Sequence, residues 1–221
     1  AKAWIVREND NRLTPTAYQE YPNPAAEPVV LHLGAGGPKI GKLTRNNLNT
    51  KEKETLTDNH TFSAESLAKT KNSNHRLLYV TSTLKEDLHL SGLPSITIKA
   101  ASSKPAVNLS AYLVSLPWNM NRRAKITDNI ITRGWADLQN HSSLTNGSAL
   151  KPGAFYKMSF DFQPDDQIIK KGQQIGLMIF SSDSEYTILP EPGTKLTVDL
   201  KETIITLPIV GGNAAFKAGV D

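Results

Sequence analysis

A glycine-rich turn near residue 36 is the first place where the sequence suggests chemistry. Gly36 is followed, after four residues, by Gly41 and Lys42, which is one residue away from a phosphate-binding loop. That motif needs a Ser or Thr hydroxyl directly after the lysine and a helix whose N-terminus faces the phosphates. Leu43 occupies the hydroxyl position, and residues 45–50 have poor helix propensity and no apolar face. We therefore predict a glycine-rich turn rather than a nucleotide site.

Residues for acyl transfer or metal catalysis do not occur in the required patterns. The serine nucleophile of α/β-hydrolases lies in G-x-S-x-G, and no serine in this sequence has glycine at both positions. The chain has no cysteine, and its histidines form neither H-E-x-x-H nor a close pair of ligand spacing. We expect structural roles for the histidines, which are His32, His60, His75, His89 and His141. No catalytic residue, cofactor site or metal site is assigned.

Aspartates near the ends of expected neighbouring strands form a second candidate group. They are Asp161, Asp165, Asp166 and Asp183. Clustered carboxylates can bind Ca²⁺ through their oxygens. Aspartate also caps turns by accepting hydrogen bonds from nearby backbone, and the Pro164–Asp166 and 181–184 segments are typical of turns. Turn chemistry is the favoured interpretation, and metal binding by any of the four is left open.

Two tryptophans are the remaining candidates, because an exposed aromatic ring can stack on a sugar or on a partner's proline. Arg133 and Gly134 precede Trp135, which places its ring near the rim of the expected sandwich. The candidate interdomain or ligand surface consists of Trp118, Arg122, Arg123, Trp135 and His141. Large aromatic residues are mostly buried, so packing in a core or against another domain is favoured over sugar binding.

The elements that position these residues are predominantly strands. From residue 76 onward, short apolar runs alternate with Gly and Pro, and no segment of ten or more residues sustains a helical apolar stripe. The expected strands are 77–84, 88–90, 95–101, 108–116, 126–132, 155–163, 174–181, 195–200 and 203–210. This pattern predicts an all-β fold, an antiparallel β-sandwich or jelly roll.

Two of these strands indicate which faces are buried. Tyr156, Met158, Phe160 and Phe162 alternate with polar residues, which predicts a half-buried strand. Residues 175–180 are apolar at every position, which predicts a central strand covered on both faces.

The chain is expected to form one principal domain. Residues 1–28 are Pro-rich and predict an extended lead-in or linker, residues 29–212 the sandwich, and residues 213–221 a C-terminal tail. Within the sandwich, residues 39–75 are polar and predict a long irregular insertion, with one helical turn around residues 63–68.

Composition excludes several classes of partner. The 25 basic and 21 acidic residues give a net charge of +4 without a dense Lys/Arg stripe, so nucleic acid is not an expected partner. No apolar run approaches the ~18 residues of a membrane span, so no membrane partner is expected. The absence of cysteine fits a reducing compartment, and the start at Ala1 suggests an excised fragment or processing.

Several segments together resemble one family. The run LYVTSTL at 78–84, followed by DLHLSG at 87–92, is similar to the family's opening strand and glycine turn, and ITDNIITRG at 126–134 to its D-G-I-L-R segment. Further similar segments are 150–156, 171–177, 181–183 and 192–194. In order and spacing they resemble the C-terminal jelly-roll domain of X-prolyl dipeptidyl aminopeptidase, a relative of the cocaine-esterase hydrolases. The segment 103–118 extends the resemblance to the bacterial cytoplasmic enzyme.

The resemblance implies a galactose-binding-domain-like jelly roll with a long polar loop insertion. It implies a parent that is a serine exopeptidase releasing Xaa-Pro dipeptides, whose Ser-Asp-His triad lies in a preceding α/β-hydrolase domain. The implied partners are that catalytic domain in the same chain and, through the parent, Xaa-Pro peptides; a homodimer is left open. No cofactor is implied, and the implied location is the cytoplasm.

Two functions follow as hypotheses. In the first, this chain is a non-catalytic domain that braces the catalytic domain and shapes substrate access. In the second, it is a free-standing carbohydrate-binding or adhesive module, which the same fold supports. Burial of Trp118 and Trp135, or their placement on a flat apolar docking face, favours the first. A groove lined by both rings favours the second.

Overall fold

The computed structural model describes residues 2–7, 14–48, 51–118, 129–190 and 192–220. The strands are β1 (Ala3–Ile5), β2 (Thr16–Tyr18), β3 (Ala26–Gly34), β4 (Gly41–Thr44), β5 (Lys53–Thr57), β6 (Leu77–Val80), β7 (Leu88–Gly92), β8 (Ser95–Ser102), β9 (Asn108–Leu116), β10 (Ile130–Asp137), β11 (Phe155–Asp161), β12 (Asp165–Ile169), β13 (Gln174–Phe180), β14 (Lys195–Asp199) and β15 (Ile204–Val210). The α-helices are α1 (Ala64–Lys69) and α2 (Gly212–Val220), and a 3₁₀ turn spans Leu138–Asn140. The expectation of an all-β fold is confirmed.

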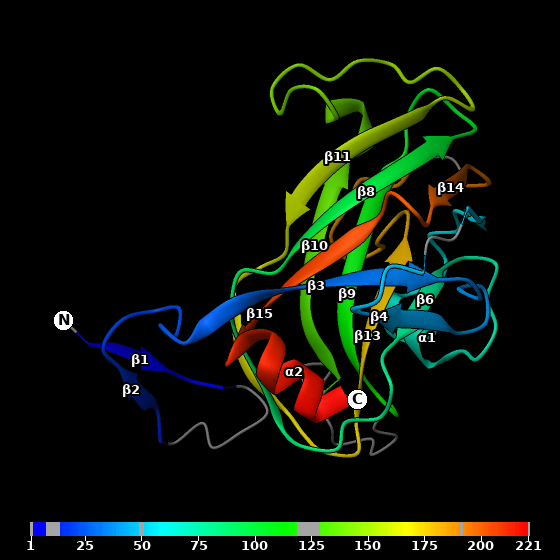
Figure 1. The fold of residues 1–221 in the computed structure, drawn as a ribbon. Helices are drawn as coiled ribbons and strands as arrows, with labels where there is room; N and C mark the ends of the chain where they lie inside the picture. Colours follow the sequence, from blue (N-terminus) through cyan, green and yellow to red (C-terminus); the bar gives the residue numbers. More distant parts are fainter. Residues whose placement is uncertain (1, 8–13, 49–50, 119–128, 191, 221) are drawn as a thin grey trace.

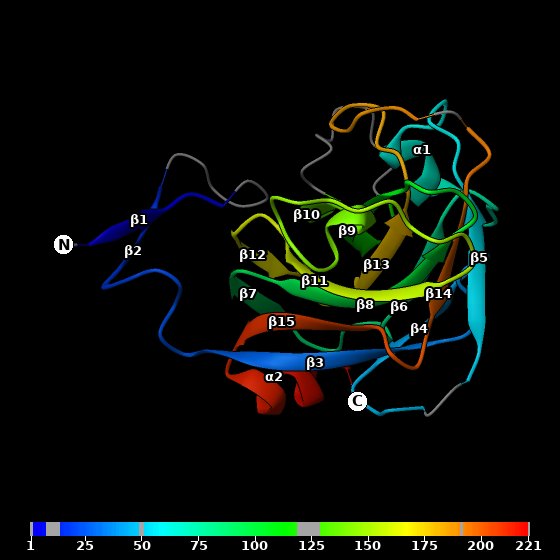
Figure 2. The ribbon, with the colours of Figure 1, turned by 90° about the horizontal axis from the view of Figure 1, so that it is seen from above.

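One large sheet contains almost all of the strands. Its order is β10-β9-β13-β6-β4-β3-β15-β8-β14-β5, with β11 paired to β8, and β7 linking β12 to β15. The pairing of β4 with β6 is parallel, and the other pairings of the described strands are antiparallel. The sheet bends so that β10, β9 and β13 form one layer and β8, β15 and β3 another (Figures 1 and 2). A jelly-roll connectivity stays a prediction.

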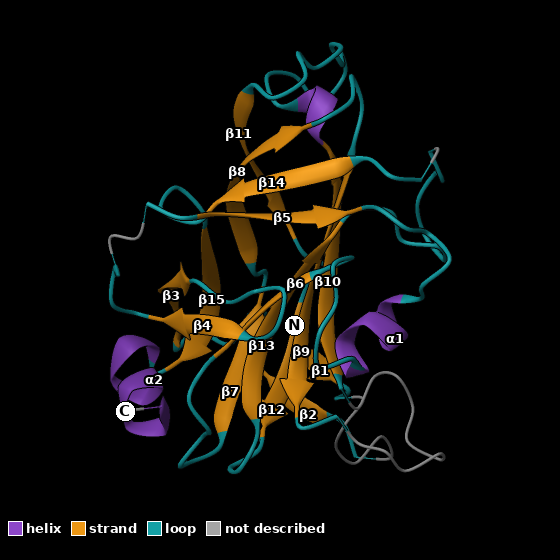
Figure 3. Cartoon of the chain, turned by 90° about the vertical axis from the view of Figure 1, so that its right-hand side faces the viewer, coloured by secondary structure: helices purple, strands orange, loops and turns teal. Residues whose placement is uncertain are grey.

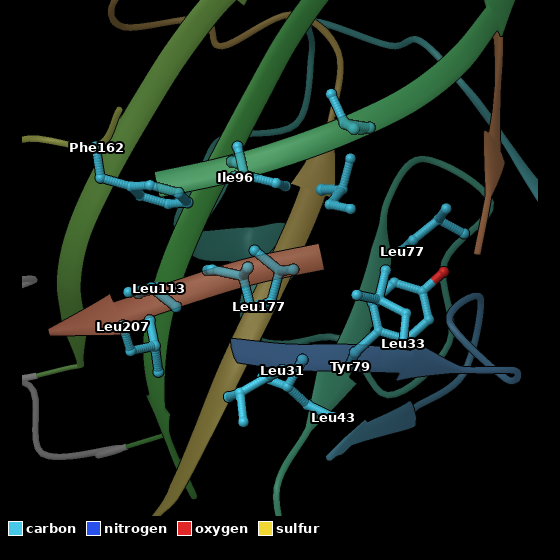
Figure 4. Packing of buried hydrophobic residues seen from close by; sticks show 14 of the residues in the cluster. Leu31, Leu33, Leu43, Leu77, Tyr79, Ile96, Leu113, Phe162, Leu177 and Leu207 are labelled. Carbon is cyan, nitrogen blue, oxygen red and sulfur yellow. The ribbon is translucent and has the colours of Figure 1, made fainter. Parts of the chain in front are cut away.

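The main core lies between the two layers. Leu113 and Leu177 of one layer belong to the same buried cluster as Ile96 and Leu207 of the other (Figure 4). Complete burial of a side chain of this size contributes roughly 1.5–3 kcal/mol. A core of this extent supports a fold without disulfide bonds.

Strand β13 is central, as the sequence predicted. It pairs with β6 on one edge and β9 on the other, and residues 175–180 are all buried. Ile175, Leu177 and Ile179 face the main core, whereas Met178 and Phe180 belong to a second apolar cluster. The run is apolar throughout because both faces of the strand are covered.

Helix α1 covers the second cluster. The Ser63 hydroxyl caps the helix by accepting a hydrogen bond from the Ser66 backbone N–H at 3.2 Å, and Ala64, Leu67 and Ala68 are buried. The predicted helical turn at 63–68 is therefore confirmed. Figure 3 shows α1 and α2 on opposite sides of the β-structure. No helix in the described part of the chain is long and apolar enough to span a membrane.

Arg76 fixes the connection between α1 and the sheet. Its side chain is fully buried and donates hydrogen bonds to the carbonyls of Gly37 (2.7 Å), Lys39 (2.8 Å), Leu67 (3.3 Å) and Thr70 (2.5 Å). Burial lowers the pKa of Arg76 to about 10, so the guanidinium remains charged near neutral pH. This cation joins the glycine-rich turn to the end of α1.

The structure differs from the expected outline in two segments. The insertion at 39–75, expected to be irregular, contributes β4 and β5 to the main sheet, and the tail expected at 213–221 contains α2. Strands β4 and β5 each bury one leucine, Leu43 and Leu56, and backbone pairing stabilises the rest. A strand with one buried leucine shows no alternation of apolar and polar residues, so the sequence did not predict β4 and β5. The division into 1–28, 29–212 and 213–221 stays a prediction, although β3 already begins at Ala26.

The alternation in β11 leads to a stability prediction. Phe160 packs against the main core, and Asp161 is exposed on the other face. We expect Phe160→Asp to lower the free energy of unfolding by roughly 3 kcal/mol, because it buries an uncompensated charge. Asp161→Leu should change it little. Urea denaturation of both variants checks this, and equal midpoints would contradict the assigned faces.

Candidate functional site

A buried carboxylate, that of Asp183, lies at the centre of the candidate site. Its Oδ2 atom accepts hydrogen bonds from the Tyr112 hydroxyl at 2.5 Å and from Trp135 Nε1 at 2.9 Å. Its Oδ1 atom accepts one from the Glu185 backbone N–H at 3.2 Å. Asp183 is fully buried, so these donors compensate for the loss of water. The carboxylate joins β9, β10 and the segment after β13.

Strand register brings the partners of Asp183 together. Tyr112 in β9 lies opposite Arg133 in β10, and Trp135 lies two residues further along β10. Residues two apart share one face of a strand, so all three side chains face away from the main core. Burial raises the pKa of the Tyr112 phenol, and the hydrogen bond to Asp183 raises it further. The phenol therefore stays protonated and donates to the carboxylate.

An arginine lies between two tyrosine rings at the outer edge of this site. The Arg133 Cζ atom is 4.9 Å from the ring centroid of Tyr186 and 5.7 Å from that of Tyr112. The Tyr186 ring also contacts Trp135, with centroids 5.1 Å apart. Backbone hydrogen bonds to the Asp183 carbonyl hold Tyr186 and Thr187 in a turn. We call Tyr112, Arg133, Trp135, Asp183 and Tyr186 the Asp183 cluster.

The Asp183 cluster borders a small cavity and an exposed apolar segment. The cavity has a volume of about 50 Å³, and it is lined by Ala64, Glu65, Tyr112, Ile130, Arg133, Glu185 and Tyr186. Tyr186, Ile188 and Leu189 are 53%, 87% and 46% exposed. In Figure 2, α1 and the segment after β13 lie over the same face of the β10-β9-β13 layer. A rigid aromatic site next to exposed apolar side chains is typical of a docking surface.

The structure brings together part of the surface predicted from the sequence. Trp118 and Trp135 both pack against the second apolar cluster, and Lys69 Nζ lies 5.5 Å from the Trp118 ring centroid. Arg122 and Arg123 lie outside the described residues.

His141 was expected beside Trp135 and lies elsewhere. Its ring contacts Tyr156 of β11, at a centroid distance of 4.4 Å, and Tyr156 packs against the main core. The 3₁₀ turn after β10 carries His141 away from the tryptophan face. A ligand or interdomain role for the five residues stays a prediction.

The aspartates do not form a common site. Asp161 is exposed on β11, and Asp165 accepts hydrogen bonds from the Asp166 backbone and the Gln167 side chain, as expected for a turn. Asp166 and Asp183 belong to separate hydrogen-bond networks. Within the described ranges, no three His, Asp or Glu side chains are grouped to hold a metal ion.

The glycine-rich turn binds a carboxylate of the chain itself. Gly36 and Gly37 donate their backbone N–H groups to Glu54, at 2.6 and 2.9 Å, and the Tyr79 hydroxyl donates to the same carboxylate at 2.6 Å. Strand β4 follows the turn where a phosphate-binding loop would have a helix. Glu54 thus occupies the anion position of this turn.

The sequence matches the model of a known protein family. The model of the X-Pro dipeptidyl-peptidase C-terminal non-catalytic domain matches residues 1–216. The chain belongs to this family. The resemblance found in the sequence is thereby confirmed.

The curated relatives are much longer than this domain. A putative Xaa-Pro dipeptidyl-peptidase of Rhodopirellula baltica is 54% identical over 212 residues, covering 96% of this chain and 34% of the relative. The Xaa-Pro dipeptidyl-peptidase of Lacticaseibacillus rhamnosus is 28% identical, covering 92% of this chain and 30% of the relative. The domain therefore spans about a third of the length of these relatives.

Solved structures share the fold of the domain. An aminopeptidase from a marine sediment Thaumarchaeota archaeon gives a TM-score of 0.69 at 14% identity, covering 89% of this chain and 39% of that one. A CocE/NonD family hydrolase from Staphylococcus aureus gives a TM-score of 0.64 at 13% identity, with coverages of 89% and 38%. At these identities the similarity concerns the fold alone.

Sequence reasoning missed a second polar network, which joins the N-terminal hairpin of this domain to the sandwich. Arg7 Nε donates to Asp166 Oδ1 at 2.7 Å, His89 Nε2 lies 3.0 Å from the same oxygen, and the Tyr18 hydroxyl contacts Arg7 and His89. Arg7 and Asp166 are 159 positions apart, so no local pattern could reveal the pair. The network holds β1 and β2 against β7 and β12.

Opposing effects set the pKa of Asp166. Burial raises it, but hydrogen bonds from His89 and Ser91 and the charges of His89 and Arg7 outweigh that effect. The net result is a lowered pKa. The ionised form of Asp166 therefore stabilises the folded domain.

The Asp183 carboxylate leads to a second stability prediction. Asp183→Asn replaces one acceptor oxygen with an NH₂ group that faces an N–H or O–H donor. We expect the free energy of unfolding to fall by about 2 kcal/mol, and Trp135 fluorescence to change. The matched control, Asp161→Asn on exposed β11, should resemble the wild type in urea denaturation. A wild-type midpoint for Asp183→Asn would contradict the proposed importance of this carboxylate.

The lowered pKa of Asp166 leads to a prediction of pH dependence. A depressed carboxyl pKa contributes stability above the unfolded value of about 3.9, and this contribution is lost as pH falls through the folded value. Amide NMR signals of β2 should therefore shift to those of a detached hairpin as the pH falls below about 4, before those of β13 change. Asp166→Asn should show the detached signals already at neutral pH. If the β2 signals of Asp166→Asn followed the same pH profile as those of the wild type, Asp166 would not be the residue that holds the hairpin.

Proposed function

We propose that this chain is the non-catalytic C-terminal domain of a serine-type exopeptidase that releases Xaa-Pro dipeptides from peptide N-termini. The family match over residues 1–216 carries this proposal. Two further observations support it. The relatives named Xaa-Pro dipeptidyl-peptidase are about three times as long, and no serine of this chain lies in a G-x-S-x-G motif. The nucleophile would belong to a preceding α/β-hydrolase domain.

We place the docking face for that catalytic domain at the Asp183 cluster. There the domain braces its partner and narrows access for peptide substrates. The exposed side chains of Tyr186, Ile188 and Leu189 support this placement, because an interdomain contact would remove their apolar surface from water. An ordinary interdomain contact buries roughly 600–1,500 Å². The absence of cysteine supports a cytoplasmic location for the parent.

The packing of the tryptophans favours this function over a free-standing carbohydrate-binding module. Trp135 donates its ring N–H to Asp183, and its ring contacts Tyr112 and Tyr186. Lys69 lies against the Trp118 ring. Both rings are thus engaged within the domain, on the face assigned to docking.

Separating the domain from its parent tests the proposal. The isolated chain should fold and should not hydrolyse an Xaa-Pro anilide, because it contributes no nucleophile. A parent without the domain should still perform the chemical step, with lower thermal stability and an altered ratio of kcat/KM between long and short Xaa-Pro peptides. Melting temperature and kcat/KM are the measurements.

Two outcomes would contradict the proposal. The first is turnover by highly purified isolated chain that survives a serine-directed inhibitor control. The second is a soluble truncated parent with an unchanged melting temperature and unchanged kcat/KM on both peptide lengths. The second result would instead favour a separate ligand for the domain.

A further inference from the structure

Arg133 combines a fixed position with unused hydrogen-bond donors. Its guanidinium faces the Tyr112 and Tyr186 rings, and its backbone carbonyl accepts a hydrogen bond from the Gln163 N–H at 2.7 Å. Among the described residues, no carboxylate lies within salt-bridge distance of the guanidinium, and no acceptor is hydrogen-bonded to it. The side chain is only partly buried. Its charge is held in place without an anionic partner.

Two other arginines show the contrast. Arg7 forms an ion pair with the buried carboxylate of Asp166. All three guanidinium nitrogens of Arg76 donate hydrogen bonds to backbone carbonyls. In both, the donors are used within the domain. When a guanidinium stacks on aromatic rings, the rings cover its faces, and its N–H groups still point outward in its own plane. Two of these N–H groups match the two oxygens of a carboxylate.

Among the described residues, Asp183, Glu65 and Glu185 form no ion pair with Arg133, although both glutamates line the same cavity. Asp183 already accepts hydrogen bonds from Tyr112, Trp135 and the Glu185 backbone. Glu65 is paired with Lys69 on α1, and the Glu185 side chain is exposed. The adjacent cavity of about 50 Å³ has room for a small polar group, since a buried water needs at least about 10–15 Å³.

We propose that Arg133 is the anchor by which this domain binds its catalytic partner. An Asp or Glu side chain of the catalytic domain would enter the cavity and form a bidentate pair with the guanidinium. Its neighbours would pack on Tyr186, Ile188 and Leu189. This inference rests on the proposed function and adds the chemistry of the partner, a carboxylate surrounded by apolar side chains.

Two observations select this occupant. The charge of Arg133 is complementary to an anion, and the exposed apolar segment beside it is complementary to a protein surface rather than to a free anion. About two thirds of the length of the relatives also lies outside the matched region. A stacked, pre-positioned arginine loses little side-chain entropy when it binds, which makes it an effective anchor.

Arginine labelling tests the anchor directly. Phenylglyoxal modifies accessible guanidinium groups, and mass spectrometry locates the adducts. In the isolated chain Arg133 should react, whereas buried Arg76 should not. In the intact enzyme, Arg133 should react at least about tenfold more slowly, because a docked guanidinium is reached only when the interface opens. Equal rates for Arg133 in both proteins would overturn the proposal.

Hydroxyl-radical oxidation of the same samples separates this inference from the proposed function. Protection of Tyr186 and Leu189 in the intact enzyme, together with an unprotected Arg133, would refute the anchor and leave the docking face in place. Without protection at any of the three residues, both the anchor and the docking face would be refuted. Protection of all three supports both.

Charge substitution provides a second test, with a matched control. Lys53 also lies against an aromatic ring, 4.3 Å from the centroid of Phe155, but on another part of the surface. In the intact enzyme, Arg133→Glu should lower the melting temperature and expose the interdomain connection to protease. Arg133→Lys should do so less, and Lys53→Glu should resemble the wild type. If Arg133→Glu lowered the melting temperature of the isolated chain equally, the loss would be local stacking, and the proposal would fail.

Discussion

The buried carboxylate of Asp183 is the interaction on which the candidate site depends. It fixes Tyr112 of β9 and Trp135 of β10, and the turn that it begins positions Tyr186. These rings in turn hold Arg133 at the surface. Burying a carboxylate is costly unless its oxygens accept hydrogen bonds. The donors on Tyr112 and Trp135 and the acceptor Asp183 must therefore be present together. The site is therefore rigid before any partner binds, which reduces the entropic cost of docking.

The sequence predicted those elements whose side-chain pattern is determined locally. The uninterrupted apolar run of 175–180 identified the central strand β13, and alternation around Phe160 identified the faces of β11. The capping serine, Ser63, begins the short helix where it was expected. Each signal comes from residues within one element, so each can be recognised without knowing the fold. The resemblance to the peptidase family was likewise found in short segments of consecutive residues.

The parts that could not be predicted depend on contacts between distant positions. Strands β4 and β5 bury only Leu43 and Leu56, and they are stabilised by backbone pairing that leaves no trace in side-chain type. Of the candidate site, the sequence identified Trp135 and named Asp183 only as a turn or metal residue. It did not identify Arg133 or Tyr186 as partners. Tyr112 and Asp183 are 71 positions apart, and only the paired strands bring them together.

The structure of an intact enzyme containing this domain is the most direct test of how the domain works. If the Asp183 cluster is the docking face, Tyr186, Ile188 and Leu189 will be buried against the catalytic domain. A carboxylate of that domain will then lie within hydrogen-bond distance of Arg133. If this face is exposed to solvent and the opposite side of the β-structure, near α2, contacts the catalytic domain, the assignment of the docking face is wrong.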